Sequence, residues 1–329
     1  MLKYSIIIIA WNRKDYIRAA FQSAMNQDYP GAWEIIVVSN FTDDLLFRAS
    51  LENPDRVRYI VNESQELGVK MVAGIMASKG KWICFLEDDD LFCPNKLSVI
   101  DRVIDTEKNA GIIKNPVAAV NAMGKEMKIP GTKSVLYGLL NPIENYPELR
   151  RKEYPLYYDI SPVQENYFSL FGSFCNSSSL TLSKEMLVNH LETVKGINLS
   201  AEHFLLSIAV MDGKKQLIVK DVLGKYRIHS NNASMNSNKT VAMTNLEKSM
   251  KDFRTASMMP LPAAYINALR TLSARFKIVY LYRMRFNRQI TTKEILRPAI
   301  IPVILCAIFG NPEIRMFTLI FHLKHSYRI

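Results

Sequence analysis

Two runs of β-branched residues near the N-terminus constrain the fold of this chain more than any other feature. Residues 5–9 read Ser-Ile-Ile-Ile-Ile, and residues 34–38 read Glu-Ile-Ile-Val-Val. Unbroken apolar runs of this kind are typical of parallel strands that helices cover on both faces. Between the runs, apolar side chains recur at helical spacing over residues 16–25. We therefore predict a strand–helix–strand unit with a right-handed crossover, which is the start of an α/β fold.

The alternation of strands and helices continues along the chain. Further strands are predicted over residues 56–61, 82–86, 111–120, 177–182 and 216–222, and further helices over residues 67–76, 94–104 and 202–211. Residues 124–162 are rich in Pro, Tyr, Asn and charge, so we expect loops or a small excursion over the site there. The pattern as a whole predicts a doubly wound, mostly parallel sheet that helices flank.

The net positive charge is concentrated at the C-terminal end. The 329 residues include 42 Lys and Arg against 31 Asp and Glu, and residues 270–329 hold eleven basic residues and two acidic ones. These cations are interleaved with aromatic residues and a Pro-interrupted apolar run at 298–309, which is typical of helices at an anionic membrane surface. A basic helical surface packed on the rest of the protein is the alternative. No nucleic-acid reader motif or zinc spacing accompanies the charge, so we expect no nucleic-acid partner.

Neither secretion nor a membrane span is predicted. The apolar run before Asn12 is too short for the core of a signal peptide, and the longest apolar stretch, 298–310, is shorter than the ~20 residues of a spanning helix. The four scattered cysteines suit reduced thiols. We expect a cytoplasmic chain, peripheral at the cytosolic face of the membrane, with a catalytic domain over residues 1–240 and a basic helical, membrane-associating region over residues 241–329.

Four consecutive acidic residues follow the predicted strand 82–86. Residues 87–90 read Glu-Asp-Asp-Asp, and ligands of open α/β sheets bind beyond the carboxyl ends of the strands. Adjacent carboxylates repel one another, and hard cations such as Mg²⁺ or Mn²⁺ prefer oxygen ligands. A divalent-cation site is one interpretation. The other is a solvated acidic turn that favours the start of the helix at Pro94.

Three segments of the first hundred residues, taken in their order along the chain, resemble the family 2 glycosyltransferases of GT-A fold. Residues 5–13 end in Ala-Trp-Asn-Arg, where that family has a Tyr-Asn-Arg-like turn after its first strand, and residues 34–39 match its second strand. Residues 79–90 begin with Lys-Gly-Lys and end in Glu-Asp-Asp-Asp, where the family has the strand that leads to an Asp-x-Asp motif. The resemblance implies a GT-A type fold with a Rossmann-like sheet, and transfer of a sugar from a nucleotide-sugar donor to an acceptor hydroxyl with inversion.

The resemblance also implies roles for individual residues. Asp89 would ligate Mn²⁺ or Mg²⁺, Glu87 would contact the nucleotide ribose or the metal, and Asp90 would be a neighbouring support. The residues implied in donor binding are Ala10, Trp11, Asn12, Arg13, Ser39, Asn40, Lys70, Glu87 and Asp88.

The second half of the chain offers two further matches. Residues 226–234 read Tyr-Arg-Ile-His-Ser-Asn-Asn-Ala-Ser and resemble the Tyr-Arg-x-His-x-x-x-x-Ser segment that closes the family's catalytic domain. This similarity implies that His229 approaches the metal and the diphosphate, whereas the histidine alone would more often be structural. About 25 residues earlier, Glu202-His203 stands where the family has Glu-Asp, with the Asp as general base. Either Glu202 or His203 could be the base here, and we favour Glu202.

Two other positions depart from the family pattern. Ser39-Asn40 stands where the family commonly has Asp-Asp or Asp-Asn to hold the base and ribose, with Asp43-Asp44 three residues beyond. The family's Ala-Arg-Asn-x-Gly helix start is represented only by Lys-Met-Val-Ala-Gly at residues 70–74. Lys70 could supply a cation near phosphate, or it could be a solvated lysine on a helix surface.

The expected partners are a nucleotide-sugar donor, a saccharide or lipid-linked saccharide acceptor, and an anionic membrane surface. Such a transferase would serve cell-surface polysaccharide or glycolipid synthesis. A nucleotidyltransferase is disfavoured because no Gly-rich basic loop follows the first strand. The departures at Ser39 and His203 leave one alternative from another class, a catalytically degenerate transferase-like subunit that binds membrane or a partner.

Overall fold

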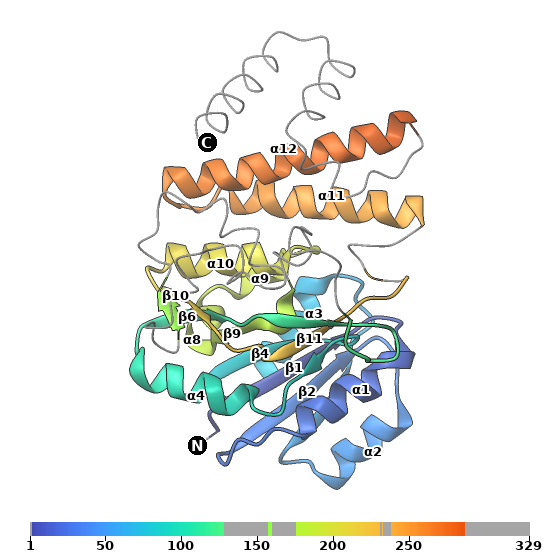
Figure 1. Cartoon of the computed structure of the whole chain (residues 1–329), viewed down its shortest axis with the longest axis vertical. Helices are drawn as coiled ribbons and strands as arrows, with labels where there is room; N and C mark the ends of the chain where they lie inside the picture. The colour runs from blue at the N-terminus through green and yellow to red at the C-terminus, as the bar shows by residue number, and fades with distance from the viewer. Residues whose placement is uncertain (1, 128–156, 160–175, 231, 233–237, 287–329) are drawn as a thin grey trace.

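The computed structural model describes residues 2–127, 157–159, 176–230, 232 and 238–286 (Figure 1). Its centre is an eight-stranded sheet. The strand order is β3 (Val57–Val61), β2 (Trp33–Ser39), β1 (Tyr4–Ala10), β4 (Trp82–Glu87), β9 (Leu180–Ser183), β6 (Ala110–Lys114), β10 (Lys215–Val219) and β8 (Tyr157–Asp159).

The four strands from β3 to β4 are parallel, and helices cover both of their faces. Ile7 pairs with Ile36 of β2 on one side and with Phe85 of β4 on the other. Because successive side chains of a strand point to opposite faces, Ile6 and Ile8 pack in one hydrophobic core and Ile7 in a second one. The predicted parallel strands covered on both faces are confirmed.

Each core lies between the sheet and one layer of helices. The first core is closed by α1 (Lys14–Met25), α2 (Asp44–Glu52) and α4 (Lys96–Thr106). The second is closed by α3 (Leu67–Ala77), α8 (Lys184–Asn189), α9 (Leu191–Lys195) and α10 (Ala201–Met211). The helices predicted over 16–25, 67–76, 94–104 and 202–211 are confirmed, within two residues at each end.

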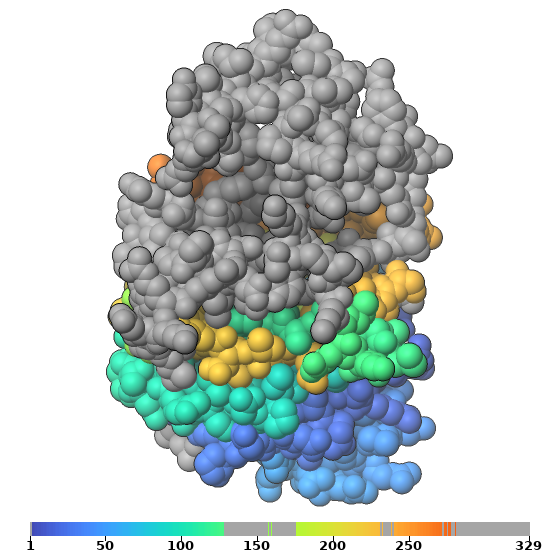
Figure 2. Space-filling model, viewed as in Figure 1, coloured from blue at the N-terminus to red at the C-terminus, as the bar shows by residue number. Residues whose placement is uncertain are grey.

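A smaller sheet corrects one sequence prediction. Its order is β5 (Leu91–Phe92), β11 (Gly224–Arg227) and β7 (Val117–Val120). The single strand predicted over 111–120 is wrong, since the chain leaves β6 at Asn115-Pro116 and enters β7 of the other sheet. Proline has no amide hydrogen for a strand ladder and suits such a break. Figure 2 shows yellow-orange residues from late in the described chain lying between teal and green residues from its first part, as the pairing of β11 with β5 and β7 requires.

Three other segments differ from the predictions. β8 is a short strand inside the segment predicted as loops, 124–162, most of which lies outside the described residues. The strand predicted over 177–182 begins with a 3₁₀ turn, η2 (Ser177–Ser179). The strand predicted over 216–222 ends at Val219.

Two further helices, α11 (Lys239–Ala256) and α12 (Ala263–Phe286), pack beyond α10 (Figure 1). Phe253 of α11 and Tyr265 of α12 belong to the same hydrophobic core as Phe204 of α10. Among the helices of the described residues, none combines the length and apolar character that crossing a membrane requires. The apolar run 298–309 lies outside the described residues.

Candidate functional site

The acidic cluster lies buried at the carboxyl end of β4. The side chains of Asp88, Asp89 and Asp90 are 0%, 2% and 1% exposed. Charges this deep in a protein are costly unless opposite charges or hydrogen bonds compensate them. The alternative of a solvated acidic turn is therefore wrong.

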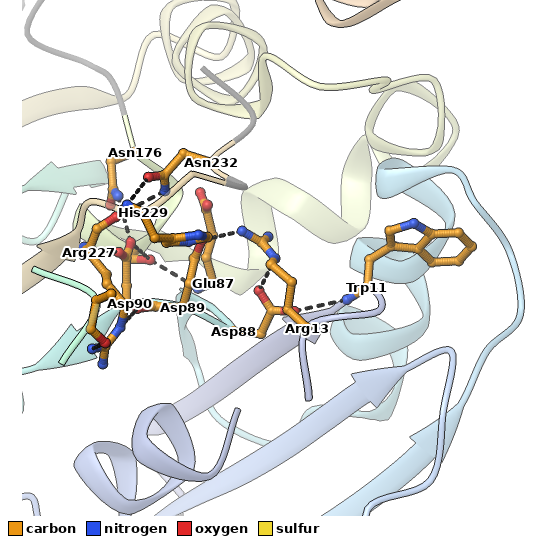
Figure 3. A network of polar contacts seen from close by, with 12 residues as sticks. Trp11, Arg13, Glu87, Asp88, Asp89, Asp90, Asn176, Arg227, His229 and Asn232 are labelled. Carbon is orange, nitrogen blue, oxygen red and sulfur yellow. Dashed lines mark hydrogen bonds and ion pairs between the residues drawn. The ribbon is translucent and has the colours of Figure 1, made fainter. Parts of the chain in front are cut away.

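Arg13 provides the nearest positive charge. Its Nε lies 2.9 Å from Oδ1 of Asp88, and its Nη1 forms an ion pair with Oδ2 of Asp89 (Figure 3). The backbone N–H of Trp11 donates to the other oxygen of Asp88 at 3.0 Å. Burial raises the pKa of Asp88 to about 7, although the charge of Arg13 opposes the shift. These contacts hold the turn after β1 against the turn after β4.

His229 approaches the cluster from the segment that follows β11. Its Nε2 lies 2.9 Å from Oδ2 of Asp89, and its backbone N–H donates to Oδ1 of Asn232 at 2.7 Å. The ring packs against Tyr16 of α1, with ring centroids 4.7 Å apart. The histidine and the acidic cluster, far apart in sequence, thus meet in one site.

Asp90 is held by hydrogen bonds from two segments. Asn176 Nδ2 and Ser178 Oγ donate to its Oδ2 at 2.6 and 2.7 Å, and the backbone N–H of Arg227 donates to its Oδ1 at 3.0 Å. Burial and the neighbouring charges of Asp89 and Glu87 raise the pKa of Asp90 well above its usual range. Asp90 therefore ties β4 to β11 and to the turn that begins η2.

The geometry of three of the four acidic residues suits a hard divalent cation. One carboxylate oxygen from each of Glu87, Asp89 and Asp90 lies within 4.8 Å of the others. Oδ1 of Asp89 is buried and has no hydrogen-bond partner among the described residues. A buried carboxylate oxygen beside an imidazole and further carboxylates is a donor set that Mg²⁺ or Mn²⁺ can use.

The ends of β1 and β2 are joined next to this cluster. The backbone N–H of Asn12 donates to Oδ1 of Asn40 at 3.0 Å, and Asn40 Nδ2 donates to Oδ1 of Asn12 at 2.7 Å. Ser39 is buried and its Oγ accepts from the N–H of Phe41 at 3.2 Å. Within the described ranges, the non-glycine residues with positive φ are Asn12 (58°) and Asn176 (73°), and both belong to this site.

Lys70 is buried beside the same turn. Its side chain is 3% exposed, its Nζ lies 4.4 Å from the centroid of the Trp11 ring, and it donates to the carbonyl oxygen of Ala10 at 3.5 Å. Burial lowers its pKa to about 8. The interpretation of Lys70 as a solvated surface lysine is wrong, and its cation faces the end of β1.

The two candidate bases on α10 have different surroundings. Burial, and after it the charge of Glu87, raise the pKa of the Glu202 carboxyl to about 7, although Lys114 and a backbone hydrogen bond from Asn176 oppose the shift. The His203 ring instead packs edge-on against Phe253 of α11, with centroids 5.2 Å apart. Glu202 thus shares the electrostatic environment of the acidic cluster, whereas the His203 ring is directed toward α11.

Several supporting residues were missed by the sequence reasoning. Ser177 Oγ donates to Glu87 Oε1 at 2.6 Å, and the fully buried Lys96 donates to Asn115 Oδ1 at 2.8 Å and to the carbonyl of Ser178 at 3.0 Å. The Ser-rich composition of residues 177–179 was the only available signal for the first contact. Lys96 carries no such signal, because its role depends on which segments the fold brings together.

Known proteins are similar in sequence to part of this chain. Residues 5–162 match the family described as Glycosyl transferase family 2. An uncharacterised glycosyltransferase of Rickettsia prowazekii is 33% identical over 109 residues, which is 33% of this chain and 34% of that protein. The putative colanic acid biosynthesis glycosyl transferase WcaA of Escherichia coli is 35% identical over 100 residues, 29% of this chain and 35% of WcaA. The matches span about a third of the length of these relatives.

Solved structures share the fold. Residues 1–349 of S. aureus TarS, crystallised in complex with UDP-GlcNAc, align with a TM-score of 0.56 and 13% identity over 93% of this chain and 82% of the TarS chain. TarS 1–349 in another crystal structure aligns with a TM-score of 0.55 over 94% of this chain and 81% of that one. Residues 5–162 are thus similar in sequence to glycosyl transferase family 2, and the fold of the chain is of the GT-A type.

Proposed function

We propose that this chain transfers a sugar from a nucleotide-sugar donor to an acceptor hydroxyl, with inversion at the anomeric carbon and with a divalent cation. The observation that carries the proposal is the 2.9 Å approach of His229 Nε2 to Asp89 Oδ2, beside a buried acidic cluster at the carboxyl end of β4. The match of residues 5–162 to a glycosyl transferase family supports the reaction class.

The donor diphosphate would lie across the ends of β1 and β4. Arg13 and Lys70 offer two positive side chains there, and a GT-A neighbour crystallised with UDP-GlcNAc supports a nucleotide sugar as the ligand. Asn12, Ser39 and Asn40 offer polar groups to the nucleoside. No acid occupies residues 39–40, so recognition there would use amide and hydroxyl groups.

Asp89 and His229 would hold the cation, with Glu87 beside them. When bound, Mn²⁺ or Mg²⁺ supplies positive charge that stabilises the departing nucleoside diphosphate. Asp90 would fix the geometry of Asp89 through its bonds to Asn176 and Ser178.

Glu202 would act as the general base. The acceptor oxygen forms a bond to the anomeric carbon, the bond from that carbon to the diphosphate oxygen breaks, and the acceptor proton passes to the Glu202 carboxylate. A base with a pKa of about 7 is well matched to this step at neutral pH. The packing of His203 against Phe253 supports Glu202 over His203 in this role.

The acceptor would be a saccharide or a lipid-linked saccharide of a cell-surface polysaccharide or glycolipid. The printed name of WcaA, which refers to colanic acid biosynthesis, supports the polysaccharide class. The basic residues of 270–329 support contact with an anionic membrane where such an acceptor would be carried.

The proposal is tested by offering the full chain a panel of nucleotide sugars with and without Mn²⁺. Donor binding is measured by calorimetry, and the anomeric configuration of the product is read by NMR with saccharide acceptors. We expect Mn²⁺-dependent binding of one nucleotide class and a product of inverted configuration. Donor binding without turnover of any acceptor would favour the degenerate subunit, and a retained configuration would refute the mechanism.

A further inference from the structure

The carboxylate of Asp252, on α11, accepts hydrogen bonds from the segment that leads into α10. Oδ1 accepts from the backbone N–H of Asn198 at 2.9 Å and from its side-chain Nδ2 at 2.7 Å. Oδ2 accepts from the backbone N–H groups of Leu199 and Ser200, both at 2.7 Å. All four bonds end on three consecutive residues, and α10 begins at the next one, Ala201.

This carboxylate is deeply buried. Asp252 is 1% exposed, and a charged acceptor of backbone N–H groups makes bonds about twice as strong as neutral ones. Ser200, the N-cap residue of α10, makes no capping hydrogen bond with its own side chain. The start of α10 is thus fixed from a different helix, more than 50 residues later in the chain.

A second contact from α11 reaches the same turn of α10. Phe253, the neighbour of Asp252, packs edge-on against the His203 ring at 5.2 Å. On its other side Phe253 meets Phe276 of α12, again at 5.2 Å. Asp252 binds residues 198–200 and Phe253 contacts His203, so Glu202 lies between two points of α10 and its leading segment that α11 holds.

We propose that Asp252 is a positioning residue for Glu202, and that α11 and α12 form a structural part of the catalytic unit. The inference depends on the proposed function, because it takes Glu202 as the base. The bonds of Asp252 end on the segment before α10 and reach none of the donor-site side chains on β1, β4 and the segment after β11. Loss of the Asp252 contacts should therefore affect the proton-transfer step and leave donor binding intact.

The test compares Asp252→Asn with Glu247→Gln in the full chain. Asparagine keeps the shape of the side chain but presents an NH₂ group to one pair of donors. Glu247 lies on the same helix and accepts a hydrogen bond from Tyr280 Oη at 2.6 Å. Among the described contacts it has none with α10. We expect Asp252→Asn to lower kcat by about 10- to 100-fold, because small misplacements of a reacting group cost that much, with donor KM unchanged within about twofold. Glu247→Gln should match the parent.

Hydrogen exchange supplies a readout that does not need turnover. The amides of Leu199 and Ser200 should exchange faster in Asp252→Asn and not in Glu247→Gln. Asn198→Ala, which removes one of the four bonds, should show a smaller loss of kcat with the same donor KM, and it serves if Asp252→Asn does not fold. An active parent whose Asp252→Asn and Asn198→Ala variants keep full kcat would overturn the inference. A parent that transfers no sugar would instead overturn the proposed function.

Discussion

We expect replacement of Asp89 with Asn to lower catalytic activity strongly and to change the stability of the fold little. Oδ2 of Asp89 accepts from Arg13 and lies 2.9 Å from His229 Nε2, whereas its Oδ1 has no hydrogen-bond partner in the part of the chain that the structure describes. The substitution keeps the shape of the side chain and removes one negative charge from the cluster. Loss of a preorganised electrostatic contact of this kind costs about 10²–10³-fold in kcat, and loss of a cation ligand adds to that.

The effect on folding should be far smaller, because opposing charges cancel. The oxygens of Glu87, Asp89 and Asp90 lie at most 4.8 Å apart. At an effective dielectric constant of about 20, two like charges at that separation repel by about 3 kcal/mol. Neutralising Asp89 relieves this repulsion and gives up a comparable attraction to Arg13. We expect the free energy of unfolding to change by about 1 kcal/mol or less, and the raised pKa values of Glu87, Asp88 and Asp90 to fall because Asp89 contributes to each.

The assay measures transfer with a saturating donor and Mn²⁺, calorimetric binding of Mn²⁺, and urea unfolding, for the parent and for Asp89→Asn. Asp105→Asn is the matched control, since it removes one carboxylate from α4 that faces Lys3 and solvent. We expect the control to retain activity. An Asp89→Asn variant with kcat near that of the parent would contradict the role given to this residue, and one that is unfolded would contradict the charge argument.

Two further predictions concern ionisable groups around the cluster. Burial raises the pKa of Glu202 to about 7, so its ionised fraction, and with it kcat, should rise as pH increases from about 6 to 8. Glu202→Gln should lower kcat by about 10²–10⁴-fold and abolish that rise, and a variant with the parent's pH profile would exclude Glu202 as the base. Lys96→Met should destabilise the fold by about 2–4 kcal/mol in urea unfolding, because it leaves Asn115 Oδ1 and the Ser178 carbonyl without their buried donor. Lys108→Met, at an exposed position, should be neutral, and equal effects of the two lysine variants would refute the argument.

Sequence periodicity predicted the parallel half of the sheet because its strands are buried on both faces, which leaves an unbroken apolar run in each. It failed at residues 111–120, where apolar side chains continue on both sides of Asn115-Pro116 but belong to two sheets. Hydrophobicity reports burial and does not report which sheet a strand joins. The break could have been inferred from Pro116, since proline seldom lies inside a central strand.

The candidate site was predictable only in part. The acidic residues stood out by their position at the end of a predicted strand, and His229 stood out because resemblance to a family marked it. The structure brings His229 within hydrogen-bonding distance of Asp89. Lys70 and Lys96 look alike in sequence, as single lysines on helices, yet both are buried against groups from distant segments. Asp252 is a similar case, because only the packing of α11 on α10 reveals its partners. Contacts between distant segments leave no local pattern to detect.

The cost of these buried charges is itself an argument that the site has a function. Three aspartates are almost wholly buried, and burial raises the pKa of Asp88 and Asp90. Oδ1 of Asp89 has no hydrogen-bond partner within the described ranges, and one arginine forms ion pairs with both Asp88 and Asp89. Replacing buried ionic groups with apolar ones of similar volume is often neutral or stabilising, so stability alone does not call for such a cluster. A ligand that brings positive charge to Asp89 would offset part of this cost. We therefore expect Mn²⁺ to raise the unfolding temperature of the parent, and the increase to be lost in Asp89→Asn but kept in Asp105→Asn.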